Sequence, residues 1–359
     1  MVMTNLTKGS ALPRSLSESE RVYLAPSQTK TGDMLTVAIR EGAVVRLMAD
    51  FERADVKAWS RNLQSHAEDV TRQLDALAAY DGLRLQKQQA GPEIMGIVNV
   101  TPDSFSDGGQ FDSTERAIAH ARKLAEEGAT ILDFGGESTR PGADLVEVGT
   151  EIKRIVPVIE RAKGFAPFLS ADTRKAEVMD AAIQAGANMI NDVTALEYEE
   201  GSLQIAARNN VRVCLMHSSA DPKVMQDNPS YDHVLFDVID YLKERIAVCE
   251  NAGLDKSRII VDPGIGFGKT VQHNLVLLKG LHFFHSLGCL VLLGASRKSF
   301  IGKIDQMAPP HPQERIGGSL SAVLMGLRAG VQIFRVHDVA QTRQAIAIWR
   351  AMDDTSLID

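Results

Sequence analysis

The sequence predicts an α/β protein, a (β/α)8 barrel of the TIM type with an N-terminal α+β extension. From residue 94 onward, eight short runs rich in leucine and β-branched residues alternate with longer helical patterns. The runs are nearly continuous in apolar residues, as is typical of parallel strands buried on both faces. Eight strand–helix units fit one barrel of about 250 residues, and the glycine-rich first turn of a doubly wound open sheet is missing.

The strands are expected at 94–100, 129–136, 168–173, 189–193, 211–217, 259–264, 290–296 and 333–338. Helices are expected between them, for example at 113–128, 175–186, 231–253 and 319–330. Each of these four helical patterns closes with a glycine, the usual residue just past a helix C-terminus.

The first ninety residues do not follow this alternation. Short strands are expected at 22–26 and 34–50, with a turn at Glu41-Gly42. From about 53 to 80, apolar residues recur at helical spacing, which predicts an amphipathic helix that packs on a core or on another subunit. Residues 86–92 are expected to be a linker. We therefore divide the chain into an extension of unknown role, 1–90, and a barrel domain, 91–359.

Composition narrows the classes of function. A net charge of −7 argues against a general nucleic-acid binder. The N-terminal stretch has no apolar signal-peptide core, and the longest apolar run, 287–295, is shorter than the roughly 20 residues that cross a bilayer. The three cysteines lie in apolar surroundings without CxxC spacing, as buried residues in a reducing compartment do. We expect a cytoplasmic protein with no membrane partner and no nucleic-acid partner.

Polar side chains follow the apolar part of every predicted strand. They are Asn99, Asp133, Asp172, Asn191, His217, Asp262, Ser296 and Arg335. In a parallel barrel these strand ends meet at one mouth, where barrel enzymes carry their active sites. A single such residue is most often a helix N-cap, and we expect that role for Asp192 and Ser113. Eight polar ends around one rim predict a functional site.

The residue types indicate what this site binds. Asp172, Asn191 and Asp262 offer acceptors for a heterocycle that donates N–H groups, and Arg335 has a planar face for stacking on such a ring. A second group suits phosphate oxygens or a metal ion: Asn99, Arg140, Lys298, Arg335 and His337. The pattern predicts a flat, nitrogen-rich ring with an anion above it.

Two loops need separate interpretation. The segment "PGIGFGKT" (263–270) resembles a P-loop, but Pro263 stands where the first glycine is required. We expect its glycines to let a flat ligand approach the backbone. The segment "NVTPDSFSDGGQF" (99–111) is too long and polar for a plain turn. It is interpreted as a lid with Phe105 at its tip, a role in loop closure for Asp103 and an N-cap or turn role for Asp107.

Seven segments together resemble the signatures of dihydropteroate synthases, in the same order, over about 94–352. They are "MGIVNVTPDSFSDGG" (95–109), "LDFGGESTRPGA" (132–143), "SADTRKAEV" (170–178), "INDVTAL" (190–196), "DPGIGFGK" (262–269), "GASRKSFIG" (294–302) and "RVHDV" (335–339).

The resemblance implies a role for each matching residue. The implied pterin contacts are Asp172, Asn191, Asp262, Lys298 and Arg335, with pocket walls at Met216, Val193, Phe267 and Gly294. The implied p-aminobenzoate contacts are Thr139, Arg140, Pro141, Phe105 and Ser299. The implied diphosphate contacts are Asn99, Thr139, Arg140, Arg335 and His337, with Asn99 also a magnesium ligand. The implied catalytic residues are Asp172, Lys298, Arg335 and Asp103.

The implied reaction joins 6-hydroxymethyl-7,8-dihydropterin diphosphate to p-aminobenzoate, with Mg²⁺ as cofactor and a homodimer as the assembly. The sequence departs from the family pattern at 218–226, after "CLMH", and at Arg174, where a small residue is common. Two alternatives stay open: a pterin- or folate-binding methyltransferase barrel, and a pterin-binding protein without catalysis.

Overall fold

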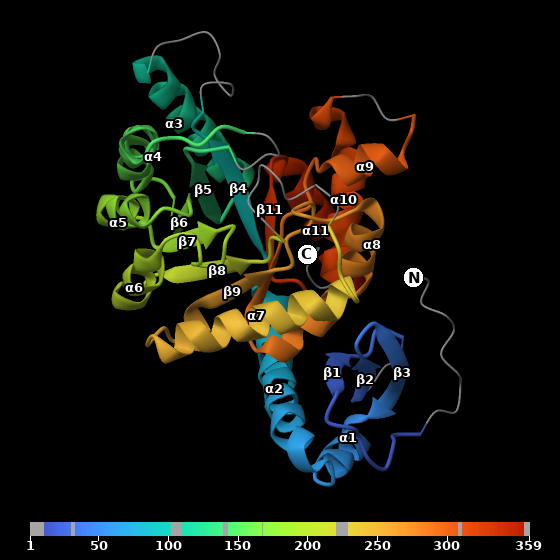
Figure 1. Cartoon of the computed structure of the whole chain (residues 1–359). Helices are drawn as coiled ribbons and strands as arrows, with labels where there is room; N and C mark the ends of the chain where they lie inside the picture. Colours follow the sequence, from blue (N-terminus) through green and yellow to red (C-terminus); the bar gives the residue numbers. More distant parts are fainter. Residues whose placement is uncertain are drawn as a thin grey trace.

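The computed structural model describes residues 11–29, 33–101, 110–138, 143–166, 168–219, 229–307 and 311–354. Eight parallel strands close into a barrel in sequence order, and the last strand pairs with the first (Figure 1). The barrel strands are β4 (Glu93–Asn99), β5 (Ile131–Gly135), β6 (Phe168–Asp172), β7 (Met189–Asp192), β8 (Arg212–Met216), β9 (Ile259–Asp262), β10 (Leu290–Leu293) and β11 (Ile333–Val336). The predicted (β/α)8 barrel is confirmed, with all eight strands in their expected places.

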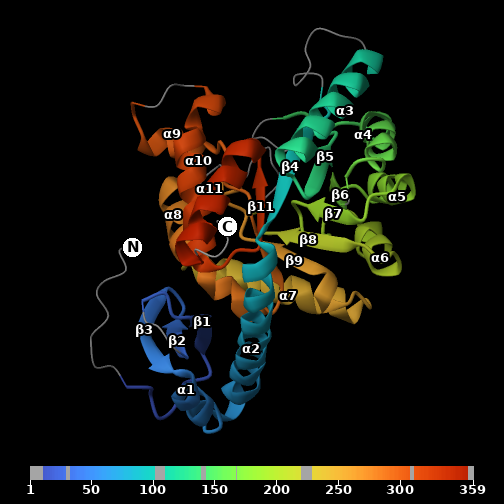
Figure 2. The ribbon, with the colours of Figure 1, turned by 180° about the vertical axis from the view of Figure 1, so that it is seen from behind.

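Helices surround the barrel between successive strands (Figures 1 and 2). They are α3 (Gln110–Glu127), α4 (Val148–Ala162), α5 (Ala176–Ala185), α6 (Glu200–Arg208), α7 (Val234–Asn251), α8 (Val271–Lys279), α9 (Ser299–Ile304), α10 (Ile316–Ala329) and α11 (Val339–Asp353). The described residues also include short 3-10 segments: η1 (Gln64–His66) before the barrel, and η3 (Lys256–Arg258), η4 (Leu281–Leu287) and η5 (Pro312–Arg315) between barrel elements.

The inside of the barrel is layered by the two-residue period of its strands. A buried apolar cluster fills the lower layer: Met95, Ile131, Met189, Cys214, Ile260, Leu292 and Ile333. Because side chains alternate between the two faces of a strand, the residue two positions later points into the same interior. Those residues include Asp133, Asn191, Met216, Asp262 and Arg335. The apolar layer therefore forms a floor beneath a polar layer that faces the mouth.

Residues 20–90 form a three-stranded antiparallel sheet with two helices. The strands are β1 (Glu20–Pro26), β2 (Met34–Glu41) and β3 (Val44–Glu52), and the helices are α1 (Arg53–Ser60) and α2 (Ala67–Ala90). The apolar stripe predicted over 53–80 packs with one face of the sheet, since Trp59, Leu74 and Leu77 share a buried cluster with Leu24 and Val37.

Two details of this region differ from expectation. The single helix predicted from 53 to 80 is broken between α1 and α2, where Gln64 has a φ of 45°. The predicted linker at 86–92 is wrong for the most part, because α2 continues to Ala90 and leads almost directly into β4. A continuous helix thus connects the small sheet to the barrel (Figure 2).

The other face of the small sheet packs on α7 and η4 of the barrel. Tyr23 and Ala38 belong to the main barrel core, and the ring of Tyr23 stacks on Phe236 with centroids 4.2 Å apart. At the edge of this contact, Arg40 donates to Asp237 over 2.6 Å and Tyr23 donates to Asp240 over 2.8 Å. Apolar burial and ion pairs therefore fix the N-terminal sheet to the barrel.

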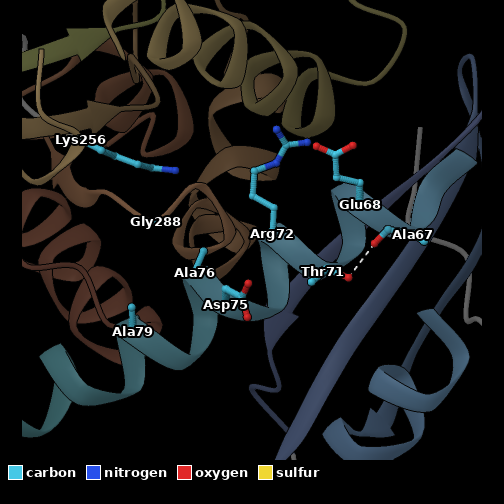
Figure 3. A pocket seen from close by; sticks show the side chains of 9 residues that line it. All are labelled: Ala67, Glu68, Thr71, Arg72, Asp75, Ala76, Ala79, Lys256 and Gly288. Atoms are coloured by element: carbon cyan, nitrogen blue, oxygen red, sulfur yellow. Dashed lines mark hydrogen bonds between the residues drawn. The ribbon is translucent and has the colours of Figure 1, made fainter. Parts of the chain in front are cut away.

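A groove of about 610 Å³ runs along α2 and faces Lys256 and Gly288 (Figure 3). Lys256 and Gly288 precede β9 and β10, so the groove lies toward the amino-terminal ends of these strands. Enzymes of this fold work at the opposite end. Among the described residues, no helix is long and apolar enough to cross a membrane.

Candidate active site

One row of the barrel brings the first predicted site residues together. Asn99 at the end of β4 pairs in register with Gly135, Gly135 with Asp172, and Asp172 with Asn191. A Cβ atom on Gly135 would lie 3.6 Å from Asp172 Oδ2 and 3.9 Å from Asn99 Oδ1. The small residue at 135 therefore leaves open space between the amide of Asn99 and the carboxylate of Asp172.

Asp133 links these residues and was not among the predicted contacts. It is fully buried, and its Oδ2 accepts from Arg335 Nε over 2.7 Å and from Asn191 Nδ2 over 3.1 Å. The sequence predicts Asp133 at a strand end, and the two-residue alternation from Ile131 is the signal that its side chain points into the barrel. Asp133 thus orients two residues that were predicted.

Arg335 forms a bridge between two carboxylates. Its Nη2 donates to Asp172 Oδ2 over 2.6 Å, while its Nε donates to Asp133 Oδ2. Burial raises the pKa of Asp172, and the charge of Arg335 acts in the opposite direction. The second oxygens, Asp133 Oδ1 and Asp172 Oδ1, are buried without a hydrogen-bond partner among the described residues. Since such acceptors are costly to leave unpaired, they are suited to a ligand that donates N–H groups.

Asp262 and Lys298 form the other side of the site. Asp262 Oδ1 accepts from the backbone N–H of Gly264 over 2.7 Å, and burial raises the pKa of its carboxyl. Burial lowers the pKa of Lys298 to about 7, although Asp262 opposes that shift. The ammonium of Lys298 lies 3.9 Å from the ring centroid of Phe267. The structure therefore brings together one carboxylate, one cation and one aromatic wall.

The structure explains why glycine is needed at two positions of the 263–270 loop. Gly264 and Gly266 have φ angles of +69° and +84°. A Cβ on Gly264 would lie 1.9 Å from the carbonyl oxygen of His217, and one on Gly266 would lie 3.0 Å from Lys298 Cδ. The predicted close approach of a ligand to this backbone stays a prediction.

The remaining predicted wall and anion residues lie around the same end of the barrel. Met216 is buried at the end of β8, Val193 directly follows β7, and Gly294 follows β10 with its Cβ position 3.6 Å from Asp262 Oδ2. His337 follows β11, and its Nδ1 lies 3.1 Å from Ser296 Oγ. Ser299 is exposed as the first residue of α9.

Several predicted residues lie outside the described part of the chain: Asp103, Phe105, Asp107, Thr139, Arg140 and Pro141. Within the described ranges, no three His, Cys, Asp or Glu side chains gather in a way that could hold a metal.

The two expected helix caps are wrong. Asp192 accepts from the N–H groups of Thr194 and Leu196, so it caps the turn after β7, while α6 begins only at Glu200. Ser113 lies inside α3, which begins at Gln110.

A buried ion cluster includes Glu137 of the second signature segment, 132–143. Lys175 Nζ contacts Glu137 Oε2 at 2.5 Å, Glu151 Oε2 at 2.6 Å and the carbonyl oxygen of Val146 at 2.6 Å. Arg174 adds a bond from Nε to Glu137 Oε1 over 3.1 Å. All four charged side chains are buried. Because residues 137 and 146 flank the 139–141 segment, this cluster fixes both flanks of it.

Comparison with known proteins identifies this arrangement. Residues 95–337 match the family described as pterin binding enzyme. The dihydropteroate synthase of Escherichia coli K12 is 46% identical over 261 residues, 72% of this chain and 91% of that one. Two structures of the Xanthomonas albilineans synthase, one with 4-aminobenzoic acid and one in complex with 7,8-dihydropteroate, superimpose with TM-scores of 0.69 and 0.66. The first is 49% identical in sequence and the second 46%. Each alignment covers 73% of this chain, and it covers 93% of the first structure and 94% of the second.

The small N-terminal sheet precedes the matched region, which begins in β4. Within that region, the closed barrel, the signature segments and the identity to characterised relatives agree. The chain belongs to the dihydropteroate synthase family of pterin-binding enzymes, which are transferases.

Proposed function

We propose that this enzyme condenses 6-hydroxymethyl-7,8-dihydropterin diphosphate with p-aminobenzoate to give 7,8-dihydropteroate and pyrophosphate. The observation that carries the proposal is a pair of buried carboxylate oxygens above an apolar floor, Asp133 Oδ1 and Asp172 Oδ1, which have no hydrogen-bond partner in the described part of the chain. A pterin presents ring N–H and amino donors to acceptors of this kind.

The pterin ring is proposed to lie flat between the polar layer and the mouth. Asp172, Asn191 and Asp262 would accept from or donate to its edge, while Phe267 and Met216 form apolar walls. Two of the five N–H donors of Arg335 serve Asp133 and Asp172. The other three have no hydrogen-bond partner among the described residues and are proposed to serve the ligand, with the guanidinium plane stacked on the ring.

In the proposed reaction, the bond between the exocyclic carbon of the pterin and the diphosphate oxygen breaks first. The electron pair leaves with pyrophosphate, and the electron-rich dihydropterin stabilises the resulting cation. The buried carboxylates Asp172 and Asp262 favour positive charge on the ring, an electrostatic form of catalysis. The neutral amine of p-aminobenzoate then forms the new carbon–nitrogen bond and loses a proton.

Asn99 is the proposed contact to the cofactor. Mg²⁺ keeps several waters and is commonly held by one or two protein oxygens together with substrate phosphates. The amide oxygen of Asn99, beside Gly135 at the carboxyl end of β4, fits that mode of binding. When bound, the ion supplies positive charge that neutralises the departing diphosphate. His337 and Arg335 are proposed to contact the same anion.

We expect Asn99→Ala to raise the KM for the pterin diphosphate and the concentration of Mg²⁺ at half-maximal rate by about tenfold each, the loss of roughly 1.4 kcal/mol. The binding constant of a pterin without diphosphate, measured by calorimetry, is expected to change less than about twofold. Asn62→Ala, at an exposed site on the small N-terminal sheet region, is the matched control with no change. Equal weakening of the pterin without diphosphate would contradict a role at the anion.

The test of the reaction itself is pyrophosphate release. It is expected to require the pterin diphosphate, p-aminobenzoate and Mg²⁺ together. Release that is indifferent to p-aminobenzoate would refute the proposed synthase, and binding of methyltetrahydrofolate would favour the methyltransferase alternative. Pterin binding with no release under any condition would favour the protein without catalysis.

A homodimer in the cytoplasm is the proposed setting. The neighbouring helices α8 and α10 expose large apolar side chains, Leu275, Leu324 and Met325, at fractions of 47%, 39% and 44%. Such side chains on adjacent elements suit a second copy. The three cysteines are free and buried, as in proteins of reducing compartments.

A further inference from the structure

A buried lysine and a buried histidine lie beyond the ends of β9 and β8, beside the proposed pterin site, and have no role in the reaction above. Lys269 follows β9 and His217 follows β8, and both are buried, with exposed fractions of 4% and 7%. Among the described residues, the side-chain ammonium of Lys269 bonds to a histidine and two carbonyl oxygens and not to a carboxylate. Burial lowers the pKa of Lys269 to about 7, although the charge of Asp262 opposes that shift. A buried ammonium without a bonded carboxylate is costly, so its presence here needs an explanation.

The hydrogen bonds of Lys269 use all three of its donors. Its Nζ lies 3.0 Å from His217 Nδ1, 3.3 Å from the carbonyl oxygen of His217 and 2.9 Å from the carbonyl oxygen of Phe267. An ammonium has three N–H groups and no acceptor, so the match is complete. Lys269 therefore ties the end of β8 to the backbone of Phe267.

The histidine acts as an acceptor in this pair. Burial and the neighbouring charge of Lys269 lower the pKa of His217 well below its usual range, so the ring stays neutral at physiological pH. A neutral ring offers one nitrogen as acceptor. The imidazole ring of His217 also packs against the ring of Tyr241 in a T-shaped contact, with centroids 4.9 Å apart. His217 thus presents Nδ1 from a fixed position.

The segment that Lys269 holds is pinned at three consecutive residues. The N–H of Gly266 donates to Asn274 Oδ1 over 2.7 Å, the carbonyl of Phe267 accepts from Lys269, and the carbonyl of Gly268 accepts from Tyr231 over 2.8 Å. The lysine supplies the middle bond and the only one of the three that carries a charge. Its loss would release the backbone at the residue whose ring contacts Lys298.

We propose that Lys269 and His217 are positioning residues for the pterin pocket, which fix the wall formed by Phe267 and the ammonium of Lys298 above it. The inference rests on the proposed function, because Phe267 is a pterin wall only if the ligand is a pterin. Neither Lys269 nor His217 touches the reacting atoms.

The experiment compares Lys269→Met, Lys269→Arg and His217→Gln in the full chain. The primary readout is the calorimetric Kd for 6-hydroxymethylpterin, and the second is the KM for each substrate in pyrophosphate release. Lys269→Met is expected to raise the Kd for the pterin and the KM for the pterin diphosphate at least tenfold. The KM for p-aminobenzoate is expected to stay within twofold. His217→Gln, which keeps the main-chain acceptors, is expected to show a threefold rise in the same two constants.

Lys269→Arg and one control separate positioning from general stability. Arginine restores charge and donors, so Lys269→Arg is expected to recover most of the affinity. His285→Phe removes another buried histidine, one that bonds the carbonyl oxygen of Ala329 and stacks on Tyr80 below the barrel. It is expected to lower the melting temperature and leave both KM values unchanged.

Three results would overturn the inference: pterin affinity that is unchanged in folded Lys269→Met, substrate constants that all rise equally, or Lys269→Arg no better than Lys269→Met. If Lys269→Met does not fold, the Kd for the pterin and the KM values of His217→Gln test the inference instead. If the wild-type protein binds the pterin but releases no pyrophosphate, the proposed reaction fails while the Kd values still decide the positioning role. A wild-type protein that binds no pterin refutes both.

Discussion

Asp172→Asn is expected to lower kcat by about 10²- to 10³-fold, the cost of removing one preorganised electrostatic contact. The substitution keeps the shape of the side chain and an oxygen that accepts from Arg335. It removes the negative charge that favours the pterin cation. The measurement is steady-state pyrophosphate release with both substrates saturating.

The same substitution is expected to change the free energy of unfolding by less than about 1 kcal/mol at pH 7. Burial disfavours the ionised form of Asp172, so a neutral isostere loses a charge-assisted bond but also removes a desolvation cost. Arg335 keeps its bond to Asp133. Near-normal turnover per folded molecule together with collapsed stability would show instead that Asp172 is structural.

The pH dependence of stability gives an independent check. The folded pKa of Asp172 is raised above its ordinary value of 3.8, so the native state holds more protons than the unfolded state across the interval between the two pKa values. Stability is therefore greatest below about pH 4 for this group and falls as pH rises toward the raised pKa. Asp172→Asn cannot ionise, so urea unfolding between pH 5 and pH 7 is expected to show a flatter profile than the wild type.

Asp192→Asn is the matched control, because Asp192 is also a buried carboxylate and lies at the end of the next strand. Its oxygens accept from Thr194 and Leu196 in a turn rather than facing the mouth. Burial raises the pKa of Asp192 as well, but both of its oxygens accept backbone N–H groups, so the NH2 group of asparagine would face one of these donors. A buried donor left without a partner costs about 1–3 kcal/mol. We expect Asp192→Asn to lose at least about 2 kcal/mol of stability and to retain its turnover per folded molecule.

The sequence predicts the barrel well because the strand pattern is redundant. Each of the eight strands shows a similar apolar run, so a wrong assignment of one strand would still leave seven that indicate the barrel. The break between α1 and α2 has no such signal, since 61–66 contains neither proline nor glycine. Helix propensity predicts that the helix continues through 86–90, because the glutamines, lysine and alanine of this segment favour helices. The nearby Gly91-Pro92 marks the stop rather than a linker.

For the candidate site, less of the arrangement can be predicted from the sequence than for the barrel. Residue types at the strand ends predict Asp172, Asn191 and Asp262, but the link through Asp133 depends on which neighbours the barrel brings across its interior. Arg335 is 202 positions away from Asp133 in the chain. No local pattern indicates that two carboxylates share this arginine; only barrel closure, which pairs β11 with β4, brings them together.

The second large effect is expected from Lys175→Met, which should destabilise the protein by about 3–5 kcal/mol, the usual cost of removing one partner from a buried ion pair. Glu151 then has no cation within hydrogen-bond distance among the described residues, and its Oε1 is already unpartnered. Glu137 keeps Arg174, at 3.0 Å from Nη2. Chemical denaturation measures the loss, and Lys123→Met, at an exposed helix pair, is the control with a change below about 1 kcal/mol.

A second substitution distinguishes uncompensated charge from lost packing. Glu151→Gln in the Lys175→Met background removes the carboxylate that the lysine balanced, so it is expected to restore a large part of the lost stability. No recovery would mean that the aliphatic stem of Lys175 matters more than its charge. Glu137 and Val146 flank residues 139–141, which the proposed function assigns to p-aminobenzoate. In folded Lys175→Met we therefore expect the KM for p-aminobenzoate to rise more than the KM for the pterin diphosphate, the opposite of the pattern expected for Lys269→Met.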